Sequence, residues 1–155
     1  MIGFAAGGFH SEDGASAKPV CLPPDPDFGK TSGPDYGRIY GAEFDNNFFA
    51  PDSDAEDVPC AVCRTIHASS VIMIPGKNKC YPGWQMEYYG YLASNYYGSK
   101  AAGTYECIDI QPEFLTGGKN NNNGKLFFNV LAKCGSLQCP PYKENYPLTC
   151  VVCSK

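Results

Sequence analysis

The sequence lacks the features that membrane-spanning and nucleic-acid-binding proteins need. No stretch of the 155-residue chain approaches the roughly 20 consecutive apolar residues of a membrane span. Its 12 Lys and Arg residues are scattered singly among 16 Asp and Glu residues, and the net charge is −4. A basic face that could neutralise phosphates is therefore absent. We expect no membrane span and no nucleic-acid partner.

Two further missing features, a signal peptide and a glycosylation site, bear on the compartment in which the protein resides. The chain does not start with the charged segment and apolar run of a secretory signal peptide. It also has no Asn-x-Ser/Thr acceptor for N-glycosylation. Nine cysteines nevertheless favour an oxidising compartment. We interpret the chain as a mature or truncated form of a secreted, extracellular protein.

Helical periodicity is missing as well. No window of about 12 residues repeats apolar positions every 3.6 residues between helix caps. Instead, 17 Gly, 13 Pro and 14% aromatic residues predict many turns and short strands. The strand patterns cover residues 64–71, 70–75, 84–92, 104–110, 125–131 and 148–152. Asn123-Gly124 predicts a hairpin turn, and the expected fold class is all-β.

A cysteine frame occurs twice in the chain. The segment CLPPDPDF, from Cys21 to Phe28, matches CIDIQPEF, from Cys107 to Phe114, at Cys, Pro, the acidic residue and Phe. Nearly the same offset aligns residues 2–5 with residues 89–92. We infer an internal duplication. The predicted organisation is one disulfide-stapled domain, 1–155, of two tandem pseudo-symmetric repeats of short antiparallel strands: an incomplete first repeat, 1–71, and a complete second repeat, 72–155.

The cysteines are divided unequally between the two repeats. Each repeat closes with a Cys-x-x-Cys pair, but only the second has Cys134 and Cys139, which lie in an insertion. The counterpart of Cys80 would lie upstream of Met1, so we expect the first repeat to be truncated. Because the total is odd, at least one thiol is unpaired or links two chains.

These motifs together resemble the C-terminal noncollagenous domain of invertebrate spongin-type short-chain collagens. The segments that carry the resemblance are CLPPDPDF (21–28), IYGAEF (39–44), VPCAVC (58–63), MIP (73–75), PGW (82–84), EY (87–88), GYL (90–92), CGSLQCPPY (134–142) and LTCVVCSK (148–155). A more distant similarity is to the tandem C-terminal domain of type IV collagen, with its Cys-Pro-x-Gly-Trp opening and Cys-x-Val-Cys closures. The chain has no Gly-x-y run and forms no collagen helix itself.

The resemblance implies a disulfide pairing. Carried over from the type IV collagen domain, it gives the pairs Cys21–Cys60, Cys80–Cys153, Cys107–Cys150 and Cys134–Cys139. Cys63 is then the unpaired or intermolecular thiol. The residues permit this pairing, because Cys150 and Cys153 point to opposite faces of a strand and need separate partners.

The Cys-x-x-Cys pairs have two alternative interpretations, a zinc site and a redox site. A four-thiolate zinc site would need both pairs, which lie far apart in the sequence, and most of the other cysteines pair naturally with them or with each other. A thioredoxin-like redox site needs a helix after its first cysteine. The Ala-Val and Val-Val fillers predict strands instead, so we expect no metal site and no cofactor.

An acidic segment offers a weak calcium-loop candidate, formed by Asp52, Asp54, Glu56 and Asp57. The glycine at the sixth loop position and the closing Glu are missing, so a solvated acidic loop is the preferred interpretation. The two histidines, His10 and His67, complete no Ser-His-Asp or Cys-His arrangement. We therefore expect no catalytic residues and no enzyme activity.

The tyrosines of the second repeat suggest binding. Aromatic rings stack on sugars and build protein interfaces. We nevertheless expect most of these tyrosines to be buried in the core. The residues are Tyr88, Tyr89, Tyr91, Tyr96, Tyr97, Tyr142 and Tyr146.

Three functions follow from these observations. The resemblance implies a non-catalytic structural domain of the extracellular matrix, which self-associates as a trimer or higher oligomer and contacts other matrix proteins. The alternative is a soluble lectin-like or defence module that binds glycans. A third, weaker interpretation is a mineral-associated matrix protein that uses residues 45–57.

Overall fold

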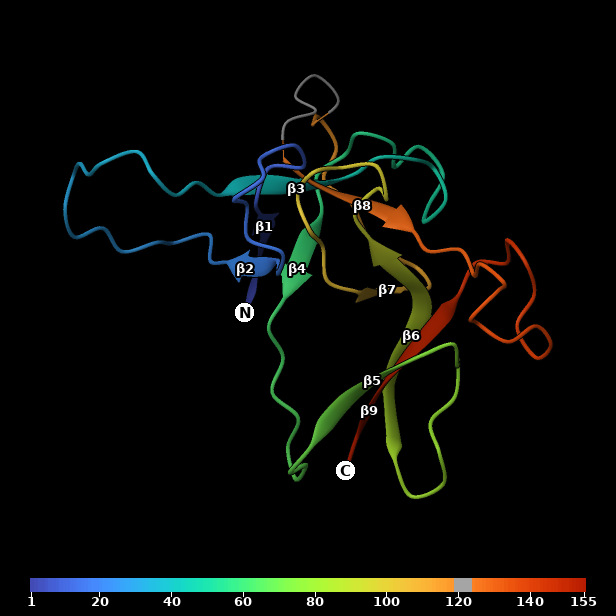
Figure 1. The fold of residues 1–155 in the computed structure, drawn as a ribbon. Coiled ribbons are helices and arrows are strands. Elements are labelled where there is room, and N and C mark those ends of the chain that lie inside the picture. Colours follow the sequence, from blue (N-terminus) through green and yellow to red (C-terminus); the bar gives the residue numbers. More distant parts are fainter. Residues whose placement is uncertain (119–123) are drawn as a thin grey trace. The chain divides into compact units, whose positions relative to one another are not determined.

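The computed structural model describes residues 1–118 and 124–155, and these ranges contain strands but no helix (Figure 1). The predicted all-β fold class is confirmed. The hairpin turn predicted at Asn123-Gly124 lies partly outside the described residues. The strands are β1 (Ile2–Gly7), β2 (Val20–Leu22), β3 (Tyr40–Phe44), β4 (Pro59–Ala61), β5 (Val71–Pro75), β6 (Gln85–Ser94), β7 (Glu106–Asp109), β8 (Lys125–Asn129) and β9 (Thr149–Ser154).

The chain divides into two compact units. Unit 1 comprises Met1–Cys63, Asn95–Thr104 and Glu113–Phe128, and unit 2 comprises Arg64–Ser94, Tyr105–Pro112 and Asn129–Lys155. Two segments of the predicted second repeat thus belong to unit 1. The repeat boundaries and the single-domain organisation stay predictions.

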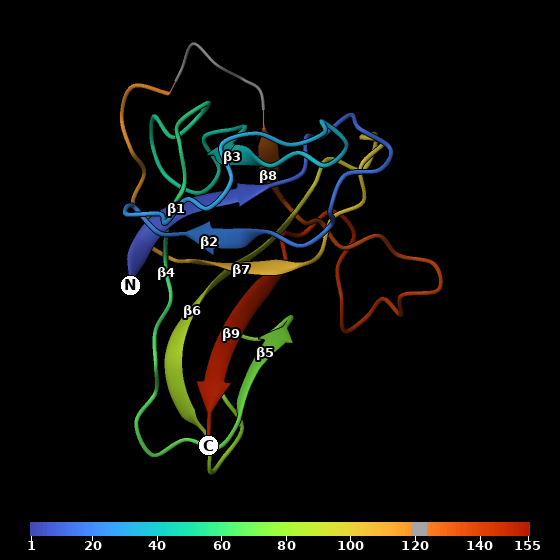
Figure 2. The same cartoon turned by 90° about the vertical axis from the view of Figure 1, so that its left-hand side faces the viewer.

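Unit 1 is organised around β1. This strand pairs antiparallel with β2, β3 and β4, and β1 and β2 lie side by side in Figure 2. β3 pairs parallel with β8, which places Glu43 opposite Leu126. The sequence predicted only antiparallel strands, so this pair is a departure. The long connection between β3 and β8 permits it, because parallel neighbours cannot be joined by a short hairpin.

Unit 2 is organised around the ten-residue strand β6. It pairs antiparallel with β7 and β9, and β9 pairs antiparallel with β5. The register between β6 and β9 shifts between Met86 and Tyr88. Such an irregularity re-aims side chains on one strand.

A glycine sits at the same place in both central strands. Gly3 in β1 lies opposite Cys60, and Gly90 in β6 lies opposite Cys150. A Cβ on Gly3 would lie 2.0 Å from a carbonyl oxygen of β2, and a Cβ on Gly90 would lie 1.8 Å from one of β7. The neighbouring backbone therefore occupies the space of the missing side chain.

This close approach explains how a disulfide joins the strands on either side of each glycine. The Cα–Cα separation is 5.7 Å for Cys21–Cys60 and 5.7 Å for Cys107–Cys150. In a flat sheet, strands separated by one strand lie roughly 9.6 Å apart. Each sheet is therefore folded sharply at its glycine. The matching registers support the internal duplication, which stays a prediction.

One predicted strand is wrong. Residues 64–70 form no strand, and β5 begins at Val71. His67 has a φ of 67°, in the left-handed region that an extended strand cannot contain. The amides of Ser69 and Ser70 instead donate to the Lys155 carbonyl, at 2.8 and 3.0 Å.

The core of unit 1 is aromatic and aliphatic. The rings of Phe44 and Phe49 lie 5.2 Å apart, and Phe127 is also buried. In unit 2 the buried side chains include Leu92, Val151 and the disulfide cysteines of β9. The two disulfides of β9 thus contribute to the interior of unit 2, whereas Cys134 and Cys139 lie at the surface.

Candidate functional site

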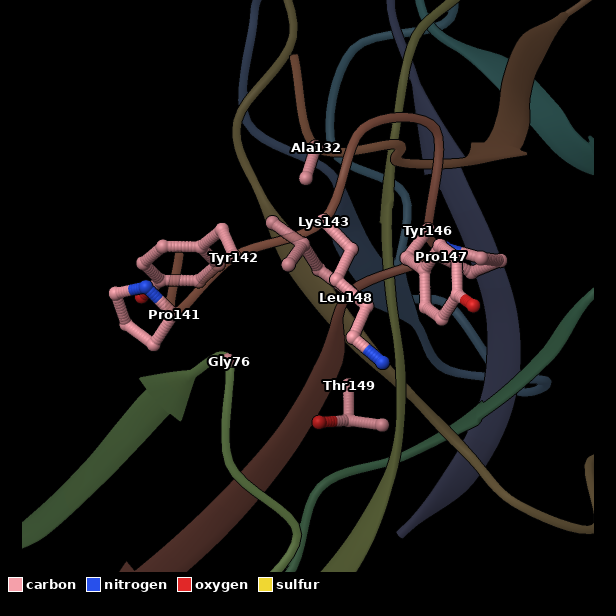
Figure 3. Close-up of a pocket in the computed structure, with 9 residues that line it drawn as sticks. All are labelled: Gly76, Ala132, Pro141, Tyr142, Lys143, Tyr146, Pro147, Leu148 and Thr149. Carbon is pink, nitrogen blue, oxygen red and sulfur yellow. The ribbon is translucent and has the colours of Figure 1, made fainter. Parts of the chain in front are cut away.

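A groove on unit 2 is large enough to hold a small ligand (Figure 3). Its volume of about 400 Å³ falls in the range of small-molecule sites, ~300–1,000 Å³. The lining residues are Gly76, Ala132, Pro141, Tyr142, Lys143, Tyr146, Pro147, Leu148 and Thr149.

The loop that carries most of this lining is closed at its base by backbone hydrogen bonds. The amide of Ala132 donates to the Tyr146 carbonyl at 3.0 Å, and the amide of Leu148 donates to the Val130 carbonyl at 2.9 Å. The amide of Asn145 donates back to Ala132 at 2.9 Å. These bonds fix the backbone on both sides of the tyrosines.

The inside of the loop is fixed by a disulfide and an acidic side chain. Cys134 and Cys139 are bonded. The Glu144 carboxylate accepts from the Cys134 amide at 2.6 Å, and the Lys133 ammonium lies 3.6 Å from the same carboxylate. Both oxygens of the Glu144 carboxylate therefore make contacts within the loop.

Two tyrosines stand on opposite sides of the groove, with Lys143 and Leu148 between them (Figure 3). Tyr142 is 37% exposed and Tyr146 is 57% exposed. The Lys143 ammonium lies 5.1 Å from the centre of the Tyr146 ring, a cation–π distance. The arrangement offers two aromatic surfaces and one cation to a ligand.

The other predicted tyrosines lie outside the groove. Tyr88 donates its hydroxyl to the Cys107 carbonyl at 3.2 Å. In unit 1 the rings of Tyr96 and Tyr97 lie 4.5 Å apart, and their hydrogen bond raises the pKa of Tyr96.

The expectation that core packing takes most of the seven tyrosines is wrong. Six of them are exposed: Tyr88, Tyr89, Tyr96, Tyr97, Tyr142 and Tyr146. Tyr91, which lies in the more buried half of β6, is half-buried. Tyr88 and Tyr89 are exposed because residues 85–89 of β6 face solvent on both sides of the strand.

The cysteines form the pairs that the resemblance implied. The disulfides are Cys21–Cys60, Cys80–Cys153, Cys107–Cys150 and Cys134–Cys139, and Cys63 is a free, exposed thiol. Within residues 1–118 and 124–155, no three His, Cys, Asp or Glu side chains gather closely enough to hold a metal ion.

The acidic segment does not bring its carboxylates together. Glu56 is buried and accepts hydrogen bonds from the amides of Gly117 and Gly118, at 2.9 and 3.2 Å. Asp52, Asp54 and Asp57 are exposed, and the amide of Asp54 donates to the Asn47 side chain. Glu56 therefore anchors a loop, and among the described residues the carboxylates of the calcium-loop candidate form no cluster that could hold a metal ion.

A second surface of interest lies on unit 1. Phe4 pairs with Leu22 across β1 and β2, and alternate residues of a strand share a face. Ile2, Phe4, Val20 and Leu22 therefore point to one side, with exposed fractions of 76, 50, 46 and 38%. We name these four residues the apolar face. The strands β1, β2 and β4 contain no charged residue.

Comparison with protein-family models, with curated proteins and with solved structures finds no match to the chain. Among the described residues, no helix has the length and apolar character needed to cross a membrane. The features of the molecule that bear on function are therefore the disulfides, the apolar face and the groove.

Proposed function

We propose that the protein is a non-catalytic structural domain of the extracellular matrix that assembles with copies of itself. Four disulfides suit an oxidising, extracellular compartment. The sequence resembles assembly domains of matrix collagens, and it offers no nucleophile–base arrangement for catalysis.

The observation that carries self-association is the apolar face. Single exposed apolar residues are ordinary, but contiguous apolar surface rimmed by polar residues is typical of interfaces. Complete burial of a Val, Leu, Ile or Phe side chain contributes about 1.5–3 kcal/mol. Four such side chains stand together here, so covering them in a trimer or higher oligomer would stabilise the assembly.

Sedimentation velocity across a concentration series tests this proposal with a matched pair of variants. Phe4→Ser removes the largest ring of the apolar face, and Phe28→Ser removes a ring that is 86% exposed elsewhere in unit 1. Because loss of one buried ring costs about 1.5–3 kcal/mol, Phe4→Ser should weaken association at least tenfold, and Phe28→Ser should leave it unchanged. A wild-type protein that stays monomeric at high concentration would contradict the proposal.

A second candidate function is a lectin-like or defence module, and the groove of unit 2 favours it. Two exposed tyrosines beside a cation can stack on sugar rings. A glycan array tests this function: sugar-competed binding is expected, and a blank array at high protein concentration would remove the candidate.

A further inference from the structure

We propose that the groove of unit 2 binds an anionic sugar ring, which carries a carboxylate or a sulfate, within an extracellular polysaccharide. The inference goes beyond self-assembly. It rests on the second candidate function, carbohydrate binding, and it adds the class of ligand.

The walls of the groove suit a flat ring with an apolar face. Tyr142 with Pro141 forms one side and Tyr146 with Pro147 forms the other (Figure 3). Tyrosine presents a large apolar surface and a polar hydroxyl on one rigid side chain. A sugar ring has the same combination, with C–H groups on its faces and hydroxyls on its rim.

The charge of the groove selects an anion. Lys143 is the one charged residue of the nine that line it (Figure 3). Its ammonium points toward Thr149, into the space between the tyrosines (Figure 3). No described carboxylate lies within ion-pair distance of it. The cation is therefore available to a ligand.

The acidic sequence neighbour of Lys143 does not neutralise it. Glu144 adjoins Lys143, but its carboxylate is held by the Cys134 amide and the Lys133 ammonium. Although the whole chain has a net charge of −4, the groove lining carries one positive charge and no negative one, and a local field of one sign concentrates ligands of the other.

The groove also offers polar groups that can orient a ring. Thr149 carries a hydroxyl and is one of the lining residues. Its carbonyl accepts from the Gly76 amide at 2.7 Å, which holds Gly76 against this edge of the groove. A few fixed polar groups among apolar walls are typical of small-molecule sites.

Calorimetric titration of the full chain with three oligosaccharides of equal length tests the proposal. The probes are a heparin hexasaccharide with sulfates, a hyaluronan hexasaccharide with carboxylates alone, and neutral maltohexaose. We expect one or both acidic probes to bind and the neutral probe to bind at least tenfold more weakly. Binding of hyaluronan would assign the interaction to the carboxylate, and binding of heparin alone would assign it to the sulfate.

Matched variants locate the binding. Because a charge-assisted contact is lost, Lys143→Met should weaken binding of the acidic probe about five- to tenfold, and Lys143→Arg should restore most of it. Lys30→Met removes the same charge from an exposed loop of unit 1 and should have no effect. Tyr146→Ala should weaken binding, whereas Tyr97→Ala, at a residue that is 94% exposed, should not. Unchanged thermal melts would verify that the variants fold.

The outcomes distinguish the choice of an anionic ligand from carbohydrate binding in general. If maltohexaose binds as tightly as the acidic probes, or if Lys143→Met binds as tightly as the wild type, the anionic class is wrong and carbohydrate binding survives. If no oligosaccharide binds, both the inference and the second candidate function fail. Neither result bears on the proposal that the protein self-assembles.

Discussion

Replacing Gly90 by alanine should disrupt unit 2. The added Cβ would lie 1.8 Å from the Ile108 carbonyl oxygen, whereas carbon and oxygen approach no closer than about 3.3 Å even in weak hydrogen bonds. The carbonyl would therefore have to retreat by about 1.5 Å. Since Ile108 follows Cys107 directly, the strain falls on the disulfide between Cys107 and Cys150.

The magnitude follows from the tolerance of that disulfide. A disulfide accepts Cα–Cα separations up to about 6.8 Å, and Cys107 and Cys150 are already 5.7 Å apart. A retreat of about 1.5 Å along that direction would exceed the limit. Overpacking costs about 1–3 kcal/mol and loss of a disulfide costs about 2–5 kcal/mol. We expect Gly90→Ala to lower the free energy of unfolding by at least about 3 kcal/mol, the sum of the two lower limits.

Urea unfolding and disulfide mapping by mass spectrometry measure this effect after oxidative refolding. Gly41→Ala is the matched control, because Gly41 lies in β3 and no atom would approach its Cβ within 4 Å. The control should be neutral or slightly stabilising, since alanine is less flexible in the unfolded chain. The reasoning is refuted if Gly90→Ala forms Cys107–Cys150 normally and unfolds within about 1 kcal/mol of the wild type.

Two further predictions concern a buried and a half-buried carboxylate. Glu56→Ala should lower the urea-unfolding free energy by about 2–3 kcal/mol, because the amides of Gly117 and Gly118 lose a charged acceptor that is itself buried; an equal loss for the exposed Asp54→Ala would contradict this cause. Burial, and secondarily the Asp54 carboxylate, raises the pKa of Asp45, while His10 opposes the shift. The folded chain therefore holds this proton more tightly than the unfolded chain, so the fold loses stability as pH rises through the folded-state pKa. Asp45→Asn should raise the thermal midpoint at neutral pH and leave it unchanged well below the usual Asp pKa of about 3.9. A thermal midpoint that changed only at low pH would contradict this prediction.

The four disulfide pairs could be predicted from the sequence, but the structural role of Gly3 and Gly90 could not. The family resemblance implied the four pairs. The alignment of residues 2–5 with 89–92 already placed Gly3 on Gly90. The structure shows that each glycine leaves space for a carbonyl group of a neighbouring strand. The sequence does not show this contact, because it joins residues far apart in the chain.

Non-local and conformational features account for the wrong predictions. The strand expected over residues 64–71 had no Pro or Gly to interrupt it, but His67 adopts a left-handed conformation, which histidine adopts more often than most residues but still only in a minority of cases. The parallel pairing of β3 with β8 depends on tertiary packing, which local strand patterns do not encode.

The groove was visible in the sequence only in part. The sequence marks Tyr142 and Tyr146 as candidates by composition alone, and it does not distinguish Lys143 between them from the isolated lysines that are common on surfaces. The backbone bonds that close the loop, from Ala132 to Asn145 and Tyr146, bring the three side chains to one place. Polar and apolar residues of such a loop carry no periodic signal.

The intact mass of the native protein after alkylation without reduction tests the central claim, an extracellular disulfide-stapled scaffold, most directly. The account predicts four intact disulfides and one reactive thiol per chain at Cys63, either alkylated or joined to the same residue of a second chain. Alkylation of all nine cysteines would mean a reduced protein and would contradict the extracellular assignment.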